Sequence, residues 1–308
     1  MHKEGIKMFK NWKLGFVILI LGFVVAGCGE RTENTSYYYG PAWTNGGKVI
    51  FTKTLQSTRK DFINSQLGTS YTDSVMTMTA AGTDEAFLFD VTGAPPYQMS
   101  NSPANDYIAY LGNLENGLFG KIIIRNIASG AHSGLEKVEL IFPSGIKSFD
   151  WSDDGKKLVY CTSQEIHTIK IDGTGDSTVT AEANLEFVSW KYSSKIAFVY
   201  ISGANKILSL INENGTGRND LSVSASVDKP QISSADTDVI YGIAGGSYCS
   251  VDVSATTPAT TEVYASFKGE IPRLSPDASK VSYSKIGEQS GIYVLDLSVT
   301  PKMETKVK

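Results

Sequence analysis

The feature that most constrains the fold is an internal repeat with a period near 40 residues. In its clearest copies a short apolar segment meets a polar turn, and a strand of alternating apolar residues follows. Three copies show this plainly: FDWSDDGKKLVY from Phe149, KPQISSADTDVIY from Lys229 and IPRLSPDASKVSY from Ile271. Looser copies begin at Pro41, Gln98 and Phe187. The equivalent positions in the six copies are Trp43, Asn101, Trp151, Trp190, Ile232 and Leu274, at intervals of 58, 50, 39, 42 and 42 residues.

Each copy continues into a second strand and another turn, as in IHTIKIDGTGD from Ile166 and ILSLINENGTG from Ile207. Alternation with period two predicts strands. Asp-Gly and Asn-Gly pairs predict turns, because Gly tolerates positive φ and Asx side chains bond their own backbone. About four strands in a 40-residue repeat are typical of a β-propeller blade. We therefore expect an all-β fold, a six-bladed β-propeller, over residues 37–308.

The repeat is irregular at two places, the long first interval and the point where the ring closes. The long first interval leaves room for a polar hairpin extension over Thr54 to Asp73, which could include a short helical turn. The last copy places its fourth strand in Glu304 to Lys308, so we expect blade six to adjoin blade one, with Tyr37 to Tyr39 joining that seam. A closed ring has no long free strand edge, which protects the protein against aggregation.

At the level of these motifs the chain resembles the TolB-like propeller repeats, whose unit reads apolar-Ser-Pro-Asp-Gly, strand, turn, apolar-Tyr-Val-x-Asp. Ser275, Pro276 and Asp277 match the first half, with Ala278 in place of Gly. The second half is matched by Ile292, Tyr293, Val294 and Asp296. The resemblance implies the propeller fold from about Tyr37 to Lys308. TolB also has an α/β domain ahead of its propeller, for which this chain leaves no room.

The N-terminal segment has the pattern of an export signal. Four lysines and one glutamate lie in the first 13 residues, and the apolar run LGFVILILGFVV covers Leu14 to Val25. Twelve residues are too few for a membrane span, which needs roughly 20, but they suit the hydrophobic region of a signal peptide. We expect residues 1–27 to be this signal.

Val25-Ala26-Gly27-Cys28 follows, and it resembles the lipobox of bacterial lipoproteins. The resemblance implies cleavage before Cys28, whose thiol takes a diacylglyceryl group with fatty acyl chains such as palmitate. Each buried CH₂ adds about 0.8 kcal/mol of membrane affinity, so several chains make a lasting anchor. The alternative is an ordinary secretory signal with an incidental Cys. Residues 28–36 are polar, and we expect them to form a flexible tether.

The same resemblance predicts a location. The chain would be lipid-anchored on the extracytoplasmic side of a bacterial envelope. Gly29 follows the Cys where an Asp would retain the protein, so in a Gram-negative cell the outer membrane is expected. The formal charge is −4 for the whole chain, and −7 once the +3 of the signal is removed. With this acidic balance we expect no nucleic-acid partner, because such binders need a basic surface.

Familiar catalytic and metal motifs are missing. His132 lies in a Gly/Ser loop and His167 on a strand, whereas a metal site needs three or four converging ligands. Asp153, Asp154 and Asp277 occupy the turn position of the repeat, and organising the turn explains them without a catalytic or calcium-binding role.

Cys161 and Cys249 lie in apolar runs of copies three and five, so we expect buried thiols and no disulfide. There is no P-loop and no G-x-S-x-G elbow. Cys28 is thus the one residue assigned a chemical role, with no catalytic, cofactor or metal residue.

Three functions remain open. We expect a non-enzymatic platform that binds an envelope protein. The alternatives are a propeller that senses a glycan or small molecule, and a propeller hydrolase or lyase. Recognition on such a scaffold usually lies in loops, and the candidate segments are Tyr37 to Tyr39, Thr54 to Asp73 and Asn113 to Phe119. Three tryptophans, Trp43, Trp151 and Trp190, occupy equivalent repeat positions, so we expect them to pack in the core.

Overall fold

In the computed structural model, the regular elements of the described chain are all strands. The described residues are 30–61, 65–91, 96, 98–104, 107–114, 117–127, 137–190, 195–223, 225–232, 238–287 and 289–308. Within these ranges, no helix is long and apolar enough to cross a membrane. Cys28 and the proposed signal, residues 1–27, lie outside the described residues.

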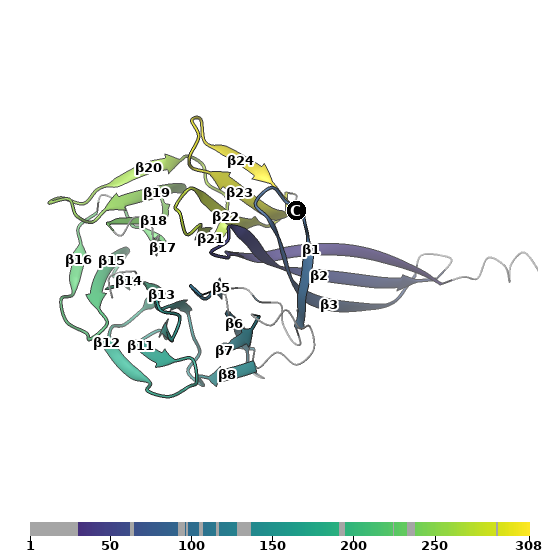
Figure 1. Ribbon diagram of the computed structural model, residues 1–308, viewed down its shortest axis with the longest axis horizontal. Coiled ribbons are helices and arrows are strands. Elements are labelled where there is room, and N and C mark those ends of the chain that lie inside the picture. Colours follow the sequence, from purple (N-terminus) through teal and green to yellow (C-terminus); the bar gives the residue numbers. More distant parts are fainter. Residues whose placement is uncertain are drawn as a thin grey trace, which may run out of the picture. The chain divides into compact units, whose positions relative to one another are not determined.

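The strands form six antiparallel sheets of four strands each, which we call blades 1 to 6 (Figure 1). Every blade consists of four strands that are consecutive in the chain. The first three blades are β1 (Arg31–Trp43), β2 (Lys48–Lys60), β3 (Gln66–Thr79), β4 (Ala86–Val91); β5 (Met99–Asn101), β6 (Tyr107–Asn113), β7 (Phe119–Asn126), β8 (Lys137–Ile141); and β9 (Ser148–Trp151), β10 (Lys157–Cys161), β11 (Glu165–Lys170), β12 (Ser177–Ala181). The other three are β13 (Leu185–Trp190), β14 (Lys195–Ser202), β15 (Asn205–Asn212), β16 (Asn219–Leu221); β17 (Asp228–Ile232), β18 (Val239–Ala244), β19 (Ser247–Asp252), β20 (Thr260–Tyr264); and β21 (Glu270–Leu274), β22 (Lys280–Lys285), β23 (Gly291–Asp296), β24 (Met303–Lys306). The prediction of a six-bladed β-propeller is confirmed.

The repeat register is also confirmed at the residue level. The six positions taken as equivalent are the last residues of β1, β5, β9, β13, β17 and β21, the first strands of the six blades. Local patterns alone could place them, because the turn that follows each strand has its own residue signature.

The apolar core is divided among the seams between blades. Six buried clusters occur among the described residues, and each combines residues of two neighbouring blades. Successive side chains of a strand point to opposite faces of the sheet. The strands of one blade therefore contribute apolar side chains to the seams on both of its sides, and every seam contains an apolar cluster.

The seam between blades 6 and 1 closes the ring. Trp43, Phe51 and Met78 of blade 1 pack there against Ile292 and Val294 of blade 6. Tyr38 lies against this cluster, as expected for the Tyr37 to Tyr39 segment. After β24 the chain continues the pairing, since the amide of Lys308 donates to the carbonyl of Ile292 at 3.2 Å. Blade 6 is completed by its own C-terminal strand, without a strand borrowed from blade 1.

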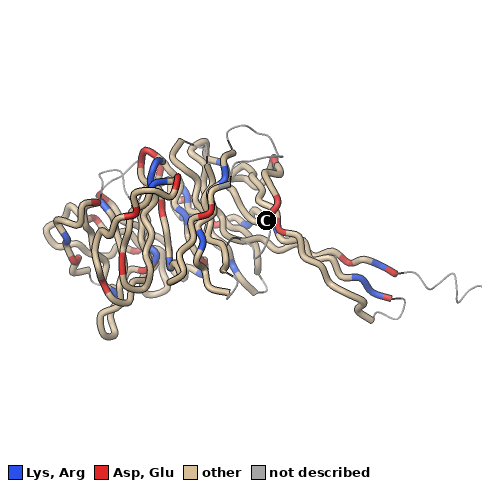
Figure 2. Tube along the Cα trace, turned by 90° about the horizontal axis from the view of Figure 1, so that it is seen from below, with Lys and Arg blue, Asp and Glu red and all other residues tan. Residues whose placement is uncertain are grey.

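The described chain separates into two compact units. Residues 37–54 and 73–308 form the propeller. The described residues of the second unit come from 30–36 and from 55–72, the outer parts of β1, β2 and β3. Residues of both charges lie along these strand segments (Figure 2). Their ion pairs include Lys60 with Glu33 at 2.6 Å and Arg59 with Glu30 at 3.7 Å.

The second unit corrects one expectation and supports another. The flexible tether expected over residues 28–36 is strand β1 from Arg31 onward, and its polar residues have partners such as the Ser57 hydroxyl, which donates to Asn34 at 2.8 Å. The hairpin extension expected over Thr54 to Asp73 is present, with β2 and β3 in its described part, and the short helical turn allowed for it is not tested there. Residues 62–64 lie outside the described residues.

Candidate functional site

The propeller has a central pocket of about 580 Å³. Its wall contains two residues from the end of each innermost strand, one pair per blade. The last residues are Trp43, Asn101, Trp151, Trp190, Ile232 and Leu274. The residues just before them, which we call the inner ring, are Ala42, Ser100, Asp150, Ser189, Gln231 and Arg273. Six strand ends therefore fix the pocket, whose size is typical of a ligand site.

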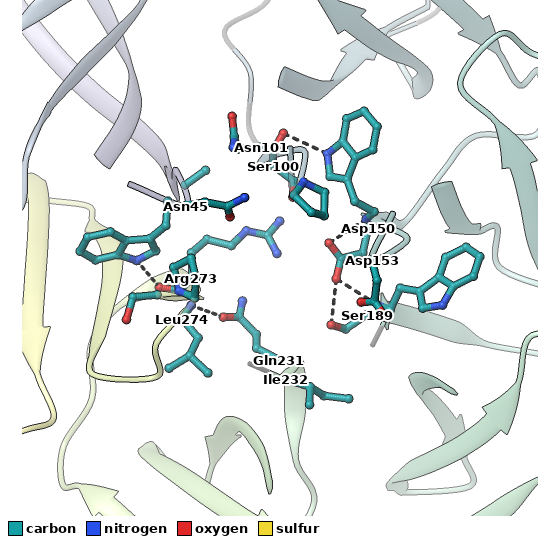
Figure 3. Close-up of a pocket in the computed structure, with 17 residues that line it drawn as sticks. Asn45, Ser100, Asn101, Asp150, Asp153, Ser189, Gln231, Ile232, Arg273 and Leu274 are labelled. Atoms are coloured by element: carbon teal, nitrogen blue, oxygen red, sulfur yellow. Dashed lines mark hydrogen bonds between the residues drawn. The ribbon is translucent and has the colours of Figure 1, made fainter. Parts of the chain in front are cut away.

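Arg273 is the central feature of this pocket (Figure 3). Its guanidinium points into the space enclosed by the inner ring. The side chain keeps some exposure, but its Nε and Nη2 atoms are buried and have no hydrogen-bond partner among the described residues. Burial lowers the pKa of the guanidinium, and the negative charge of Asp150 partly opposes that shift.

Asp150 lies on the facing wall and is held by its neighbours (Figure 3). Its Oδ1 accepts a hydrogen bond from the amide of Trp151 at 2.9 Å. Its Oδ2 accepts one from the Ser189 hydroxyl at 2.9 Å and one from the Trp190 amide at 3.1 Å. The carboxylate therefore bridges blades 3 and 4.

Gln231 has a comparable structural task between blades 5 and 6. Its amide nitrogen donates to the carbonyl of Pro272, and its amide oxygen accepts from the backbone of Leu274 at 2.6 Å. Both ends of the side chain are thus occupied. The Asp150, Ser189 and Gln231 side chains hold the ring together, whereas Nε and Nη2 of Arg273 have no hydrogen-bond partner in the described part of the chain.

The tryptophans expected in the core are buried, and they also face the pocket. Trp43, Trp151 and Trp190 are 7%, 4% and 6% exposed, so the packing expectation is correct. The indole of Trp43 donates to the carbonyl of Arg273 at 2.8 Å, and that of Trp151 donates to Ser100 at 3.2 Å. Each bond crosses to a neighbouring blade.

The aspartates of the repeat turn behave as expected. Asp154 accepts from the Ser152 hydroxyl at 2.8 Å and from the Lys156 amide at 3.0 Å. Asp277 makes the same two kinds of bond, and they hold its pKa at about 2. Asp153 differs, because it lines the central pocket.

The remaining candidates of the sequence do not meet at this pocket. His167 lies on β11, stacked on Tyr160 with 4.9 Å between ring centroids, and its Nε2 is 3.2 Å from Glu165. Cys161 and Cys249 are buried free thiols on β10 and β19, and burial raises the pKa of Cys161 to about 12. His132 lies outside the described residues.

The candidate loop segments are likewise not part of the pocket wall. Tyr37 to Tyr39 is half-buried, and Leu118 in the Asn113 to Phe119 segment is 51% exposed. Within the described ranges, no three His, Cys, Asp or Glu side chains converge as metal ligands. The chemistry of the pocket thus comes from the inner ring, which sequence reasoning missed. The available signal was its place one residue before each repeat anchor.

Comparison with solved structures shows the same fold at low sequence identity. TolB from Acinetobacter baumannii is 12% identical, with 89% of this chain and 79% of that chain covered and a TM-score of 0.60. A chain of a nidogen/laminin complex is 10% identical, with 88% and 92% covered and a TM-score of 0.57. No family model and no curated protein sequence matches the chain. The TolB-like propeller architecture expected from the repeat motifs is thereby confirmed.

A third similar structure corrects the expectation that the chain is not an enzyme. The oligogalacturonate lyase of Vibrio parahaemolyticus is 11% identical, with 90% of this chain and 85% of that chain covered and a TM-score of 0.50. A protein that is named as an enzyme therefore has a similar architecture over most of its length. The lack of familiar catalytic motifs cannot exclude catalysis, although so distant a likeness assigns no reaction to this chain.

Proposed function

We propose that the protein is a lipid-anchored propeller of the bacterial envelope that binds a protein partner at the mouth of its central pocket. The observation that carries the proposal is the inner ring, in which six strand ends form one surface that is polar at every position except Ala42. Cross-blade bonds such as Gln231 to Leu274 hold that surface in place. Preorganised groups favour binding because little ordering remains to be done on association.

The envelope location is supported by the N-terminal sequence. The apolar run and Val25-Ala26-Gly27-Cys28 are what export and lipidation require. The similar structures add limited support, since one is a TolB and another comes from a protein–protein complex. Anchoring on Cys28 would present the propeller to other extracytoplasmic proteins, and Gly29 favours the outer membrane in a Gram-negative cell.

Crosslinking in intact cells tests this proposal. A photo-crosslinking amino acid at Asn45, an exposed residue of the pocket wall, should capture a specific protein. The matched control carries the same group at Ile141, which is 58% exposed on the outer strand β8. Equal capture at both positions, or none at Asn45, contradicts recognition at the pocket.

A second function is favoured by one observation, the volume of the pocket. About 580 Å³ lies in the range of small-molecule sites. Under this alternative, the protein senses a glycan or small molecule instead of a protein. A thermal-shift screen of envelope glycans and metabolites would then give stabilisation by a defined compound, and Asn45 would capture no protein.

A further inference from the structure

The Arg273 side chain presents an unused pair of donors to the central pocket. Nε and Nη2 are both buried and unpaired among the described residues. The N–H groups on these two atoms point the same way, along one edge of the planar guanidinium. This edge forms two parallel hydrogen bonds to a carboxylate or phosphate. The backbone carbonyl of Arg273 is occupied separately, by the indole of Trp43.

The described residues form no ion pair with this guanidinium. No carboxylate lies within 4.0 Å of it among the ion pairs of the described residues. The negative charge of Asp150 acts on the guanidinium, but the Asp150 oxygens accept hydrogen bonds from Trp151, Ser189 and Trp190. Burying an unpaired charge is unfavourable, so this arrangement is expected where a ligand completes the pair.

The charges of the pocket wall limit what the ligand can be. Arg273 is the one cationic side chain of the described wall, and Asp150 and Asp153 are also part of it. A phosphate dianion would need more positive charge than a single guanidinium beside two carboxylates can supply. A planar group with one negative charge fits the donor edge, and the two carboxylates repel it less than they repel a dianion.

We propose that the central pocket is a carboxylate-binding site in which the Nε and Nη2 edge of Arg273 receives the ligand in a bidentate manner. The carboxylate belongs to a free small acid or to a peptide chain that enters the pocket. Apolar parts of that ligand lie against Trp43, Ile232 and Leu274 of the wall. This site does not depend on the proposed protein partner, because either carrier brings the same chemical group.

Tryptophan fluorescence of the purified full-length protein tests the site directly. Three of the four tryptophans of the chain line the pocket, and the fourth is Trp12 of the proposed signal. Sodium acetate is titrated near pH 7 at a constant ionic strength of about 0.15 M, balanced with chloride. We expect a saturable change at millimolar acetate. A linear change, or the same change with chloride alone, overturns the proposal.

Variants identify the residue responsible. Arg273→Met keeps the length but removes the donors, and it should abolish the acetate response. Arg273→Lys keeps the charge without the paired edge, and it should weaken acetate binding by roughly ten-fold. Arg59→Gln removes an exposed arginine of the second unit and should bind acetate as the wild type does. An unchanged response in a folded Arg273→Met variant contradicts the assignment.

Peptides distinguish the two carriers of the carboxylate. N-acetyl-tetra-alanine with a free C-terminus is compared with its C-terminal amide. Binding of the acid more tightly than acetate indicates a peptide chain, whereas binding of acetate alone indicates a small acid. Equal binding of acid and amide overturns the carboxylate proposal. A failed crosslink at Asn45 leaves these titrations interpretable, since they use no partner protein.

Discussion

At the residue scale, the repeated aspartates are turn organisers with a common geometry. In blade 6, the Asp277 carboxylate accepts from Ser275 and from the Ser279 amide, and the Ser275 hydroxyl accepts from the Lys280 amide at 2.9 Å. Blade 3 repeats all three bonds around Asp154. A second aspartate, such as Asp296, holds the turn before the outer strand by accepting from Ser298. These bonds satisfy turn amides that strands leave unpaired.

The two turns have different residues at the position with positive φ. This difference predicts that exchanging the residues changes the stability in opposite directions at the two turns. Ala278 has φ 56°, where blade 3 has Gly155 with φ 65°. Ala278→Gly should stabilise the protein by about 0.5–1 kcal/mol, because relief of left-handed strain exceeds the entropy that Gly adds to the unfolded chain. Gly155→Ala should destabilise it by about 1 kcal/mol, since an added Cβ meets ordinary contacts and only the backbone is strained.

Urea unfolding of both variants measures these changes. Two changes of the same sign would show that contacts at the two turns, rather than backbone strain, determine the outcome.

The pKa of Asp277 predicts a pH dependence. Hydrogen bonds from Ser275 and Ser279 lower this pKa from 3.8 to about 2 in the folded state. The carboxylate therefore stabilises the fold fully above pH 3.8, and this contribution is lost as the pH falls through about 2. Asp277 is exposed, so after allowance for solvent screening we expect about 1 kcal/mol. The difference in unfolding free energy between wild type and Asp277→Asn should shrink below pH 4. A difference that stays constant from pH 6 to pH 2.5 contradicts this account.

At the scale of elements, an apolar cluster joins each pair of neighbouring blades. At several seams a side chain of one blade also donates a hydrogen bond to the backbone of the next. Gln98 donates to the carbonyl of Phe149 at 2.9 Å between blades 2 and 3. Ser148 donates to Val188 at 3.3 Å between blades 3 and 4. Gln231 donates to the carbonyl of Pro272 between blades 5 and 6, and Trp43 donates to the carbonyl of Arg273 between blades 6 and 1. Buried carbonyls at the strand ends thus find donors that their own sheet does not supply.

The hydrogen bond from the Trp43 indole at the closing seam predicts that two equivalent substitutions, Trp43→Phe and Trp190→Phe, destabilise the protein unequally. Trp43→Phe removes the bond from the indole to Arg273 and leaves a buried carbonyl with one donor fewer. Trp190→Phe is the control, because its indole nitrogen has no such bond in the described part of the chain. We expect Trp43→Phe to cost about 1–2 kcal/mol more. Circular dichroism during urea unfolding measures both values, and equal losses would show that ring packing alone stabilises the seam.

At the scale of the whole molecule, the propeller is a ring whose blades each consist of consecutive strands. Closure depends on packing between the first and last blades, with Lys308 also paired to Glu85 at 2.6 Å. The proposed anchor is chemically separate from this ring. Cys28 precedes the first strand of the ring in the sequence, so we expect that the lipid and the propeller can be altered independently.

This independence predicts the behaviour of a non-lipidated variant. Cys28→Ser should move the protein from the membrane fraction to the soluble fraction, because the acyl chains supply the membrane affinity. The propeller should unfold at the same temperature in both forms. Fractionation and thermal unfolding of the two proteins test this, and a variant that stays fully membrane-bound contradicts lipid anchoring.

The blades could be predicted from sequence because their signals are local. The alternation in KKLVY and the turn residues around Asp154 lie within a dozen positions, so six strand ends were placed correctly. The strand over Arg31 to Ser36 was missed because its composition is polar, and its pairing depends on partners more than 20 residues away, such as Ser57. The fold of that segment is decided by tertiary contact.

By itself, the sequence determined the number of blades, the register of their inner strands and the place of the turns, since each depends on neighbouring residues. Only the tertiary structure decided what the centre of the ring is made of. Asp150, Gln231 and Arg273 share a register position but no chemical type, and they are 42 to 123 residues apart. No local pattern could show that one guanidinium edge inside the pocket finds no partner among the described residues of the ring.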